Sequence, residues 1–146
     1  MDPRYQVQLK IRKPAAEVFA AVVRPEKLSS YFVQAASAPL AEGATVKWRF
    51  AEVPGEHDVS VRRIVNDQLI LLEWAGAESG HKIQVRMTFQ PLDAGATLVQ
   101  ISESGWRDTP ADLAASHGNA GGWMHMMCCL KAYLEYGINL RAGGAR

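Results

Sequence analysis

The feature that most constrains the fold is the stretch from residue 44 to residue 104, where apolar and polar residues alternate in four short runs and a fifth, residues 69–74, is almost continuously apolar. Side chains of a β-strand point alternately to its two faces, so each run predicts a strand with one buried face. Turn-forming residues separate the runs at residues 53–56, 66–67, 78–80 and 93–95. Connections this short favour hairpins, and the stretch therefore predicts an antiparallel meander. The residues expected to face inward are Val46, Trp48, Phe50, Val59, Val61, Ile70, Leu72, Trp74, Ile83, Val85, Met87, Phe89, Val99 and Ile101.

The chain before the meander predicts one further strand and two short helices. Residues 5–12 alternate again, with Tyr5, Val7, Leu9 and Ile11 on one face. Pro14 favours the first turn of a helix, since the missing N–H of proline costs nothing there. A second short helix is expected at residues 25–29.

The chain after the meander predicts two helices. Thr109, Pro110 and Asp112 have the spacing of a cap, a first helical residue and a third-position acid. Gly118 is expected to end this helix, and Asn119 to cap a longer one over residues 120–140. The longer helix is amphipathic and is expected to lie against the sheet. Its apolar stripe consists of Trp123, Met127, Leu130 and Leu134, with Met126 and Ile138 beside it.

Length and composition exclude several classes of protein. The 146 residues predict a single domain, residues 1–146, with residues 142–146 as a frayed tail. Sixteen basic and fifteen acidic side chains give a net charge of +1, which argues against nucleic acid as a partner. The absence of a long apolar run argues against a targeting segment and against membrane insertion. The only cysteines, Cys128 and Cys129, are neighbours, which favours a reducing compartment, the cytoplasm.

Several short motifs carry a resemblance to known proteins. They are Lys13-Pro-Ala-Ala-Glu-Val-Phe19, Pro25-Glu-Lys-Leu28, Tyr31-Phe32, Leu71-Leu-Glu-Trp74, and Gly122-Trp123 followed by Leu130 and Leu134. With these motifs the chain resembles the START-like (SRPBCC) superfamily over nearly its whole length, in the branch of activator of heat-shock protein 90 ATPase homologues, and a bacterial protein is expected.

The resemblance implies the α+β helix-grip fold. In that fold a curved antiparallel sheet of about six to seven strands wraps around a long C-terminal helix, and two short helices follow the first strand. A cavity lies between the sheet and the helix. Members of the superfamily bind lipids, hormones and polyketides, and a few are cyclases or aromatases, so the resemblance implies ligand binding without naming a reaction.

The aromatic and sulfur-containing side chains on the inward faces have two interpretations. In most folds such a stripe is packed core, but in the helix-grip fold it is about equally expected to line an apolar pocket. The predicted ligand-binding residues are Trp48, Phe50, Trp74, Met87, Phe89, Ile101, Glu103, Trp106, Trp123, Met126, Met127 and Leu130.

Two titratable residues are candidates for chemistry. Glu103 is in phase with Val99 and Ile101, so its carboxylate is expected to point inward, where it would act as an acid or base or hold a ligand hydroxyl. Its alternative role is structural, bonding backbone N–H groups or pairing with an arginine. His57 is in phase with Val59 and is expected at the cavity mouth or in an exposed turn. The two would form a proton-handling pair only if the sheet brings them together.

The remaining motifs predict less. Residues 124–129 contain methionine, histidine and cysteine, but on a helix only His125 and Cys129 share a face, so no metal site and no cofactor are expected. His125, Cys128 and Cys129 are expected on an outer or flanking surface. The apolar helix face formed by Met124, Cys128, Ala132 and Tyr136 indicates cover by residues 105–122 or by a second subunit of a homodimer. Residues 106–113, between flanking glycines, would form either a lid or a fixed loop.

Three functions are consistent with these patterns. The first is binding of a small apolar or aromatic ligand, resembling a lipid, polyketide or hormone, without an assigned reaction. The second is a cyclase- or hydrolase-type enzyme that uses Glu103 with His57. The third is an interaction module for a chaperone ATPase; it is placed last, because that role belongs to proteins with an additional N-terminal domain and this chain begins directly at its first strand.

Overall fold

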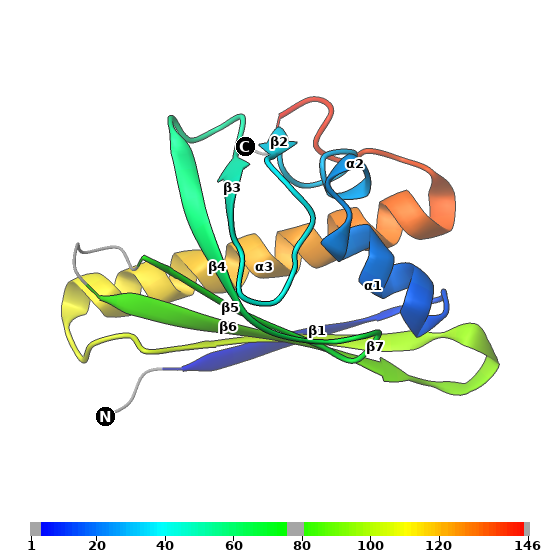
Figure 1. Cartoon of the computed structure of the whole chain (residues 1–146), viewed down its shortest axis with the longest axis horizontal. Coiled ribbons are helices and arrows are strands. Elements are labelled where there is room, and N and C mark those ends of the chain that lie inside the picture. The colour runs from blue at the N-terminus through cyan, green and yellow to red at the C-terminus, as the bar shows by residue number, and fades with distance from the viewer. Residues whose placement is uncertain (1–3, 76–80, 145–146) are drawn as a thin grey trace.

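The computed structural model describes residues 4–75 and 81–144 and consists of a curved antiparallel sheet with one long helix across it (Figure 1). The seven strands follow the order β1-β7-β6-β5-β4-β3-β2. The predicted turn at residues 78–80 lies outside the described residues. The strands are β1 (Tyr5–Ile11), β2 (Ala35–Ala36), β3 (Thr45–Arg49), β4 (Glu56–Val65), β5 (Leu69–Ala75), β6 (Lys82–Pro91) and β7 (Thr97–Ser104), and the helices are α1 (Ala15–Val23), α2 (Pro25–Leu28) and α3 (Pro110–Tyr136).

The sheet curves around α3, as the helix-grip expectation required. Strands β3 and β4 rise away from the lower strands, so that α3 runs through the concave side (Figure 1). The register of β4 against β5 shifts between Val61 and Arg63, and such an irregularity bends a strand and increases its twist. The two-residue strand β2, which the sequence did not predict, extends the sheet beyond β3.

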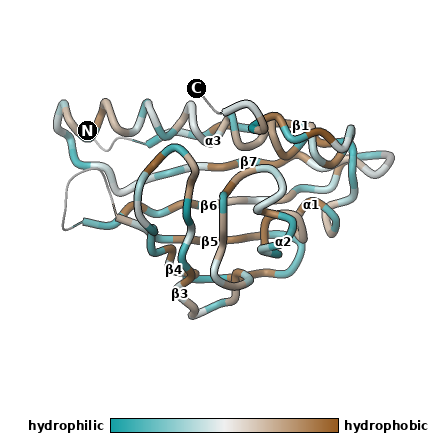
Figure 2. The backbone as a smooth tube through the Cα atoms, turned by 90° about the horizontal axis from the view of Figure 1, so that it is seen from above, coloured by the Kyte–Doolittle hydropathy of each residue, from teal (hydrophilic) through white to brown (hydrophobic). Residues whose placement is uncertain are grey.

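The inward faces of the strands are those that the alternation predicts. Brown and teal segments alternate along the strands below α3 (Figure 2). On β6 and β7 every second residue is buried, and this series includes the carboxylate-bearing Glu103. The predicted inward residues Ile70 and Leu72 of β5 are fully buried, and Leu69 is buried as well. Each element therefore contributes one apolar face to a shared core under α1, α2 and α3.

Helix α3 corrects the prediction of two helices. It begins as predicted, because the Thr109 side chain accepts a hydrogen bond from the backbone N–H of Asp112 at 3.1 Å, with Pro110 in the first turn. It then continues through Gly118 and Asn119 without a break to Tyr136. Packing against the sheet outweighs the weak helix propensity of glycine and asparagine.

The end of α3 is also earlier than predicted. Gly137 adopts φ +68°, a left-handed conformation that glycine reaches without strain, and its N–H bonds the carbonyl of Tyr133. The predicted stripe residue Ile138 is therefore outside the helix and is exposed. Residues 142–144, predicted to be frayed, form hydrogen-bonded turns with Asn139 and Arg141.

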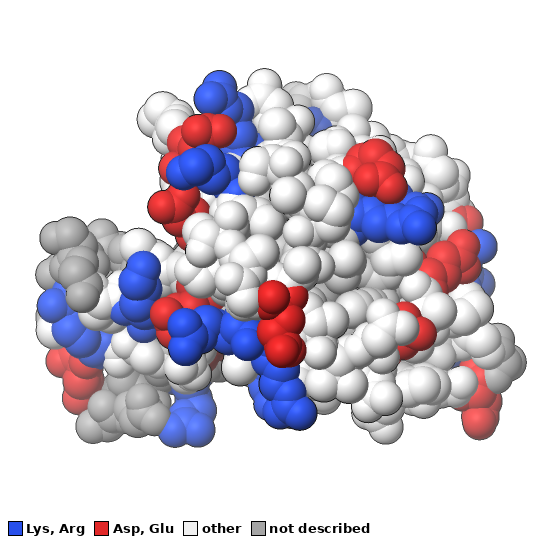
Figure 3. Space-filling model, viewed as in Figure 1, with Lys and Arg blue, Asp and Glu red and all other residues white. Residues whose placement is uncertain are grey.

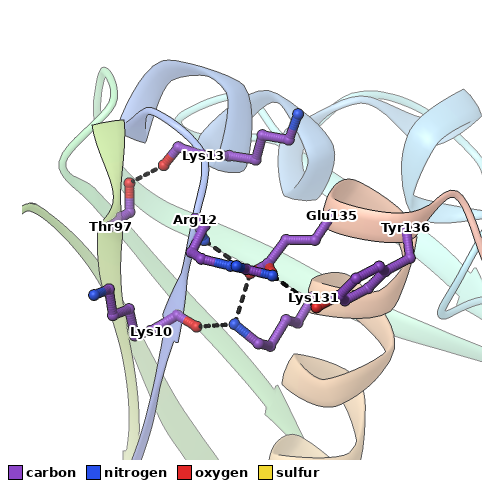
Figure 4. A network of polar contacts seen from close by, with 7 residues as sticks. All are labelled: Lys10, Arg12, Lys13, Thr97, Lys131, Glu135 and Tyr136. Atoms are coloured by element: carbon purple, nitrogen blue, oxygen red, sulfur yellow. Dashed lines mark hydrogen bonds and ion pairs between the residues drawn. The ribbon is translucent and has the colours of Figure 1, made fainter. Parts of the chain in front are cut away.

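A polar network joins the C-terminal end of α3 to β1 (Figure 4). Glu135 accepts from the backbone N–H of Arg12 at 2.8 Å, from its Nε at 2.7 Å and from Lys131 Nζ at 2.6 Å. Lys131 also donates to the carbonyl of Lys10. Burial raises the pKa of Glu135, but these hydrogen bonds outweigh it and lower the pKa to about 2.

Charged side chains of both signs lie in separate patches on the face seen in Figure 3, with a broad uncharged surface between them. On the described part of this face the charged side chains form no continuous basic track of the kind that binds a phosphate backbone. Among the residues that the structure describes, no helix is long and apolar enough to cross a membrane.

Candidate functional site

Two adjoining cavities lie between α3 and the concave side of the sheet. The larger has a volume of about 840 Å³ and the smaller about 420 Å³. Both are lined by Phe50, Val53, Trp74 and Asn119, so they are parts of one cleft. The volumes fall in the range of small-molecule sites, roughly 300–1,000 Å³.

The larger cavity combines aromatic walls with a polar mouth. Phe50, Trp74 and Trp106 supply the aromatic surface, and Lys47 and Asp58 form an ion pair of 2.7 Å at its rim. Two lining residues, His57 and Trp106, carry ring nitrogens (Nε2 and Nε1) that are buried and lack a hydrogen-bond partner within residues 4–75 and 81–144. An unsatisfied buried polar atom costs about 1–3 kcal/mol, and both of these atoms belong to residues that line the larger cavity.

A tight turn places Trp106 on this wall. Trp106 is only 4% exposed. The preceding residue, Gly105, has φ +96°, and a Cβ there would lie 2.8 Å from the carbonyl oxygen of Lys82. Residues 110–113 are the first turn of α3 rather than part of a separate helix.

Glycines of α3 leave the smaller cavity open. Gly118 and Gly122 line it one helical turn apart, and a Cβ added at either would meet no atom within 4 Å. Aromatic rings also line this cavity: the Trp74 and Trp123 rings stack at a centroid distance of 5.4 Å, and Phe32 lies 5.8 Å from Trp123. The two glycines of α3 leave space beside rings that come from β5, from α3 itself and from the segment after α2.

The C-terminal segment closes one end of the smaller cavity. Arg141 forms an ion pair with Glu52, contacts Nδ1 of His125 at 3.3 Å, and lies 5.7 Å from the centroid of the Phe32 ring. Cation, carboxylate and ring come from three separate parts of the chain. Sequence reasoning missed this contact because Arg141 and Glu52 are far apart in the sequence and no local pattern relates them.

Glu103 lies at the base of the cleft and is 1% exposed. Its carboxylate accepts from the Tyr5 hydroxyl, from Trp74 Nε1 at 3.2 Å and from Asn119 Nδ2 at 3.1 Å. Burial and the adjacent carboxylate raise the pKa of Tyr5, so its hydroxyl keeps its proton and donates. The inward orientation predicted for Glu103 is confirmed, and its partners are side chains rather than the expected backbone or arginine groups.

His57 and Glu103 are not brought together. They lie on β4 and β7, three strands apart, or roughly 14 Å along the sheet. His57 instead packs on the ring of Phe50, at a centroid distance of 5.7 Å. The geometry offers no direct proton path between them.

Of the twelve predicted ligand-binding residues, four line the cleft: Phe50, Trp74, Trp106 and Trp123. The other eight do not line either cavity, which corrects that expectation. Seven of these are filled core, because strand and helix side chains interdigitate below the cleft. They are Trp48, Met87, Phe89, Ile101, Met126, Met127 and Leu130, and the eighth is Glu103.

Asn119 is the lining residue that sequence reasoning misassigned. It was expected to cap a helix, but it lies inside α3, lines both cavities and bonds Glu103. Asparagine and glycine are both unfavourable in a helix interior. Gly118, Asn119 and Gly122 within one predicted helical stretch were therefore the signal in the sequence that could have pointed to a functional site.

The sulfur-containing part of α3 is structural. Cys129, expected on an outer or flanking surface, is fully buried, and burial raises the pKa of its thiol to about 11. Its Sγ lies 3.5 Å from Nε2 of His125. Within the described residues no group of three or more His, Cys, Asp or Glu side chains is arranged to hold a metal ion.

Residues 110–122 continue the same helix, so they do not cover its apolar face as predicted, and Tyr136 on that face is 60% exposed.

Comparison with solved structures shows the same fold in other proteins. Protein SSP2350 from Staphylococcus saprophyticus superposes with a TM-score of 0.79 at 29% identity, covering 96% of this chain and 97% of its own. DynU16, from the dynemicin biosynthetic locus, has a TM-score of 0.80 at 26% identity, with 94% of this chain and 49% of DynU16 covered. This chain thus spans about half of DynU16.

A third structure, the Aha1 dimer from Colwellia psychrerythraea, matches with a TM-score of 0.76 at 22% identity, covering 92% of this chain and 98% of that one. None of the curated proteins matches the chain. The family model described as "Activator of Hsp90 ATPase homolog 1-like protein" matches residues 12–135, which include β2 to β7 and nearly all of α3.

Proposed function

The chain belongs to the family of Activator of Hsp90 ATPase homolog 1-like proteins, and from this premise we propose that it binds a small apolar or aromatic ligand in the cleft under α3. The observation that carries the proposal is the cavity of about 840 Å³ with aromatic walls and two unpartnered ring nitrogens. Aromatic walls favour a flat apolar body, and the unpartnered nitrogens favour at least one polar atom on it.

The DynU16 neighbour supports the same ligand class. That protein belongs to the dynemicin biosynthetic locus. The two free cysteines are compatible with a reducing compartment, and we place the binding activity in the cytoplasm.

Native mass spectrometry of the freshly purified protein tests for a bound ligand. We expect an additional mass of a few hundred daltons that extracts into organic solvent under denaturing conditions. A protein without this mass is then titrated with 2-naphthol while the tryptophan fluorescence is followed, because Trp74 and Trp123 line the cleft. No additional mass and no saturable quenching would contradict the proposal.

A glycine substitution tests whether the ligand occupies the smaller cavity. Gly122→Ala places a methyl group in its open space. Alanine also stabilises a helix interior by about 0.5–1 kcal/mol relative to glycine. We therefore expect the free energy of unfolding to rise. The affinity for the ligand should fall about three- to ten-fold, the size of effect expected when the ligand loses one contact.

Gly121→Ala is the matched control, since Gly121 lies in the same helix and lines neither cavity. It should give the same gain in stability with unchanged affinity. Equal affinities for both variants would place the ligand elsewhere.

A homodimer is a second proposal, independent of the ligand. Three large apolar side chains at the C-terminal end, Tyr136, Ile138 and Leu140, are about half or more exposed. The Colwellia neighbour is described as a dimer. Sedimentation equilibrium of the wild type and of Ile138→Lys tests this proposal. A wild-type dimer that the lysine substitution dissociates supports it. A monomeric wild type at about 100 μM, well above the dissociation constant of a stable dimer, contradicts it.

A further inference from the structure

The side chain of Asn119 is the polar group shared by both cavities, and one buried carboxylate determines its orientation. Nδ2 of Asn119 lies 3.1 Å from Oε1 and 3.4 Å from Oε2 of Glu103. A carboxylate accepts hydrogen bonds and does not donate them, so only the NH₂ group of the amide can face it. The amide oxygen Oδ1 is therefore the atom of the group that is turned away from Glu103.

Glu103 is itself held in place by two other donors. The Tyr5 hydroxyl of β1 donates to Oε1, and the Trp74 indole of β5 donates to Oε2. The indole N–H can only donate, and the Tyr5 hydroxyl keeps its proton and donates as well. Both groups therefore hold the carboxylate in one orientation. Both oxygens of Glu103 are therefore satisfied without a ligand.

We propose that Glu103 is a positioning residue: it fixes the amide of Asn119 so that Oδ1 faces the cleft and selects ligands that donate a hydrogen bond, such as a phenol or another hydroxyl compound. The proposal rests on the proposed function, since it assigns the substrate class of that same cleft. It gives the buried carboxylate a role that needs no proton transfer and no contact with the ligand.

The test compares two probes of nearly equal shape. 2-Naphthol can donate a hydrogen bond, and 2-methoxynaphthalene can only accept one. With the wild type we expect 2-naphthol to bind about five-fold more tightly, the value of one neutral hydrogen bond. The affinities are measured by tryptophan quenching and by calorimetry.

Glu103→Gln should abolish this selection. The Trp74 indole can only donate, so the oxygen of the new amide takes the Oε2 position and its NH₂ group takes the Oε1 position, where the Tyr5 hydroxyl can accept from it. The same NH₂ group then faces Asn119, so Oδ1 of Asn119 turns away from the cleft to accept from it and the NH₂ group of Asn119 turns toward the cleft. Both probes can accept from that NH₂, so the affinity ratio should fall from about five to about one while 2-methoxynaphthalene binds more tightly. Asn119→Ala should also give a ratio near one, with both affinities at the lower value.

Each outcome decides the proposal. A ratio that stays unchanged in Glu103→Gln, or an equal loss of both affinities, overturns it and leaves Glu103 a purely structural residue. Binding of neither probe to the wild type would be a failure of the proposed function itself, and the inference would fall with it. Glu73→Gln on β5, at a residue that lines neither cavity, is the matched control and should keep the wild-type ratio.

A measurement on the wild type covers the case in which Glu103→Gln does not fold. Assigned NMR spectra should show nuclear Overhauser effects from the side-chain NH₂ of Asn119 to ring protons of Tyr5 or Trp74, and slow exchange of these NH₂ protons with water. An NH₂ group without these contacts and in fast exchange would show that Oδ1 faces Glu103 or that the amide rotates freely, and would overturn the proposal.

Discussion

Gly105 links the end of the sheet to the wall of the cleft through two separate constraints. Its φ of +96° is a conformation that side chains other than glycine rarely adopt, and its Cα faces the carbonyl oxygen of Lys82 so closely that a Cβ would lie at 2.8 Å. The next residue, Trp106, is then directed to the larger cavity. A single backbone position thus determines where β7 ends and where the cavity wall begins.

Gly105→Ala is expected to lower the free energy of unfolding by about 3 kcal/mol, because it adds a backbone clash to the conformational strain. Urea denaturation followed by circular dichroism measures this loss. Gly55→Ala is the control, since Gly55 has φ +86° with no atom within 4 Å of an added Cβ, and it should lose only about 1 kcal/mol. Equal losses in the two variants would contradict a role of the Lys82 contact.

At the level of elements, β1 and the last turns of α3 are joined by the carboxylate of Glu135, which is buried but has several hydrogen-bond donors around it. The Glu135 side chain is 3% exposed, yet it accepts from Arg12 and Lys131. The network connects the first strand with the last helix: Arg12 and Glu135 are 123 residues apart in the sequence. It holds the helix over the concave face of the sheet, and hence over the cleft.

The network predicts a dependence of stability on pH. The pKa of Glu135 is lowered from 4.5 to about 2 in the folded state. A lowered pKa stabilises the fold fully above the unfolded value of 4.5, and this contribution is lost as the pH falls toward 2. We expect the wild type to lose roughly 1–3 kcal/mol more than Glu135→Gln between pH 5 and pH 2, as measured by urea titrations at each pH. Parallel curves for the two proteins would contradict the prediction.

In the whole molecule, the segment after α3 returns over the helix toward α2 and β2 (Figure 1). Arg141 of this segment pairs with Glu52 of the β3–β4 connection, and the two side chains are 14% and 18% exposed. The pair therefore joins the C-terminal segment to the far end of the sheet and closes one end of the smaller cavity.

A double-mutant cycle with Arg141→Met and Glu52→Gln measures this connection. Because the pair is mostly removed from water, we expect a coupling of about 1 kcal/mol or more in the free energy of unfolding, above the value for an exposed pair. The exposed pair Lys47–Asp58, at 52% and 64%, is the comparison and should give less. A coupling near zero for Arg141 and Glu52 would show that the segment is held by other contacts.

The strands other than β2, their inward faces, the two short helices and the cap at Thr109 follow from local patterns, because alternation and capping depend on residues close in the sequence. The resemblance likewise pointed to a cavity between sheet and helix. The lining of that cavity was decided by the tertiary structure: Met87 and Trp48 have the same inward phase as Trp74, but curvature of the sheet buries the first two and leaves the third at the cleft.

The continuity of α3 and the role of Asn119 also depended on the tertiary structure. Gly118 and Asn119 have the local chemistry of a helix end, and only packing against the sheet carries the helix through them. The sequence by itself determined that Glu103 faces inward, because side chains of a strand alternate between its two faces and Glu103 is in phase with Val99 and Ile101. That Tyr5, Trp74 and Asn119 meet there depended on the pairing of β1 with β7 and on where α3 crosses the sheet, and such distant contacts are not encoded in any local pattern.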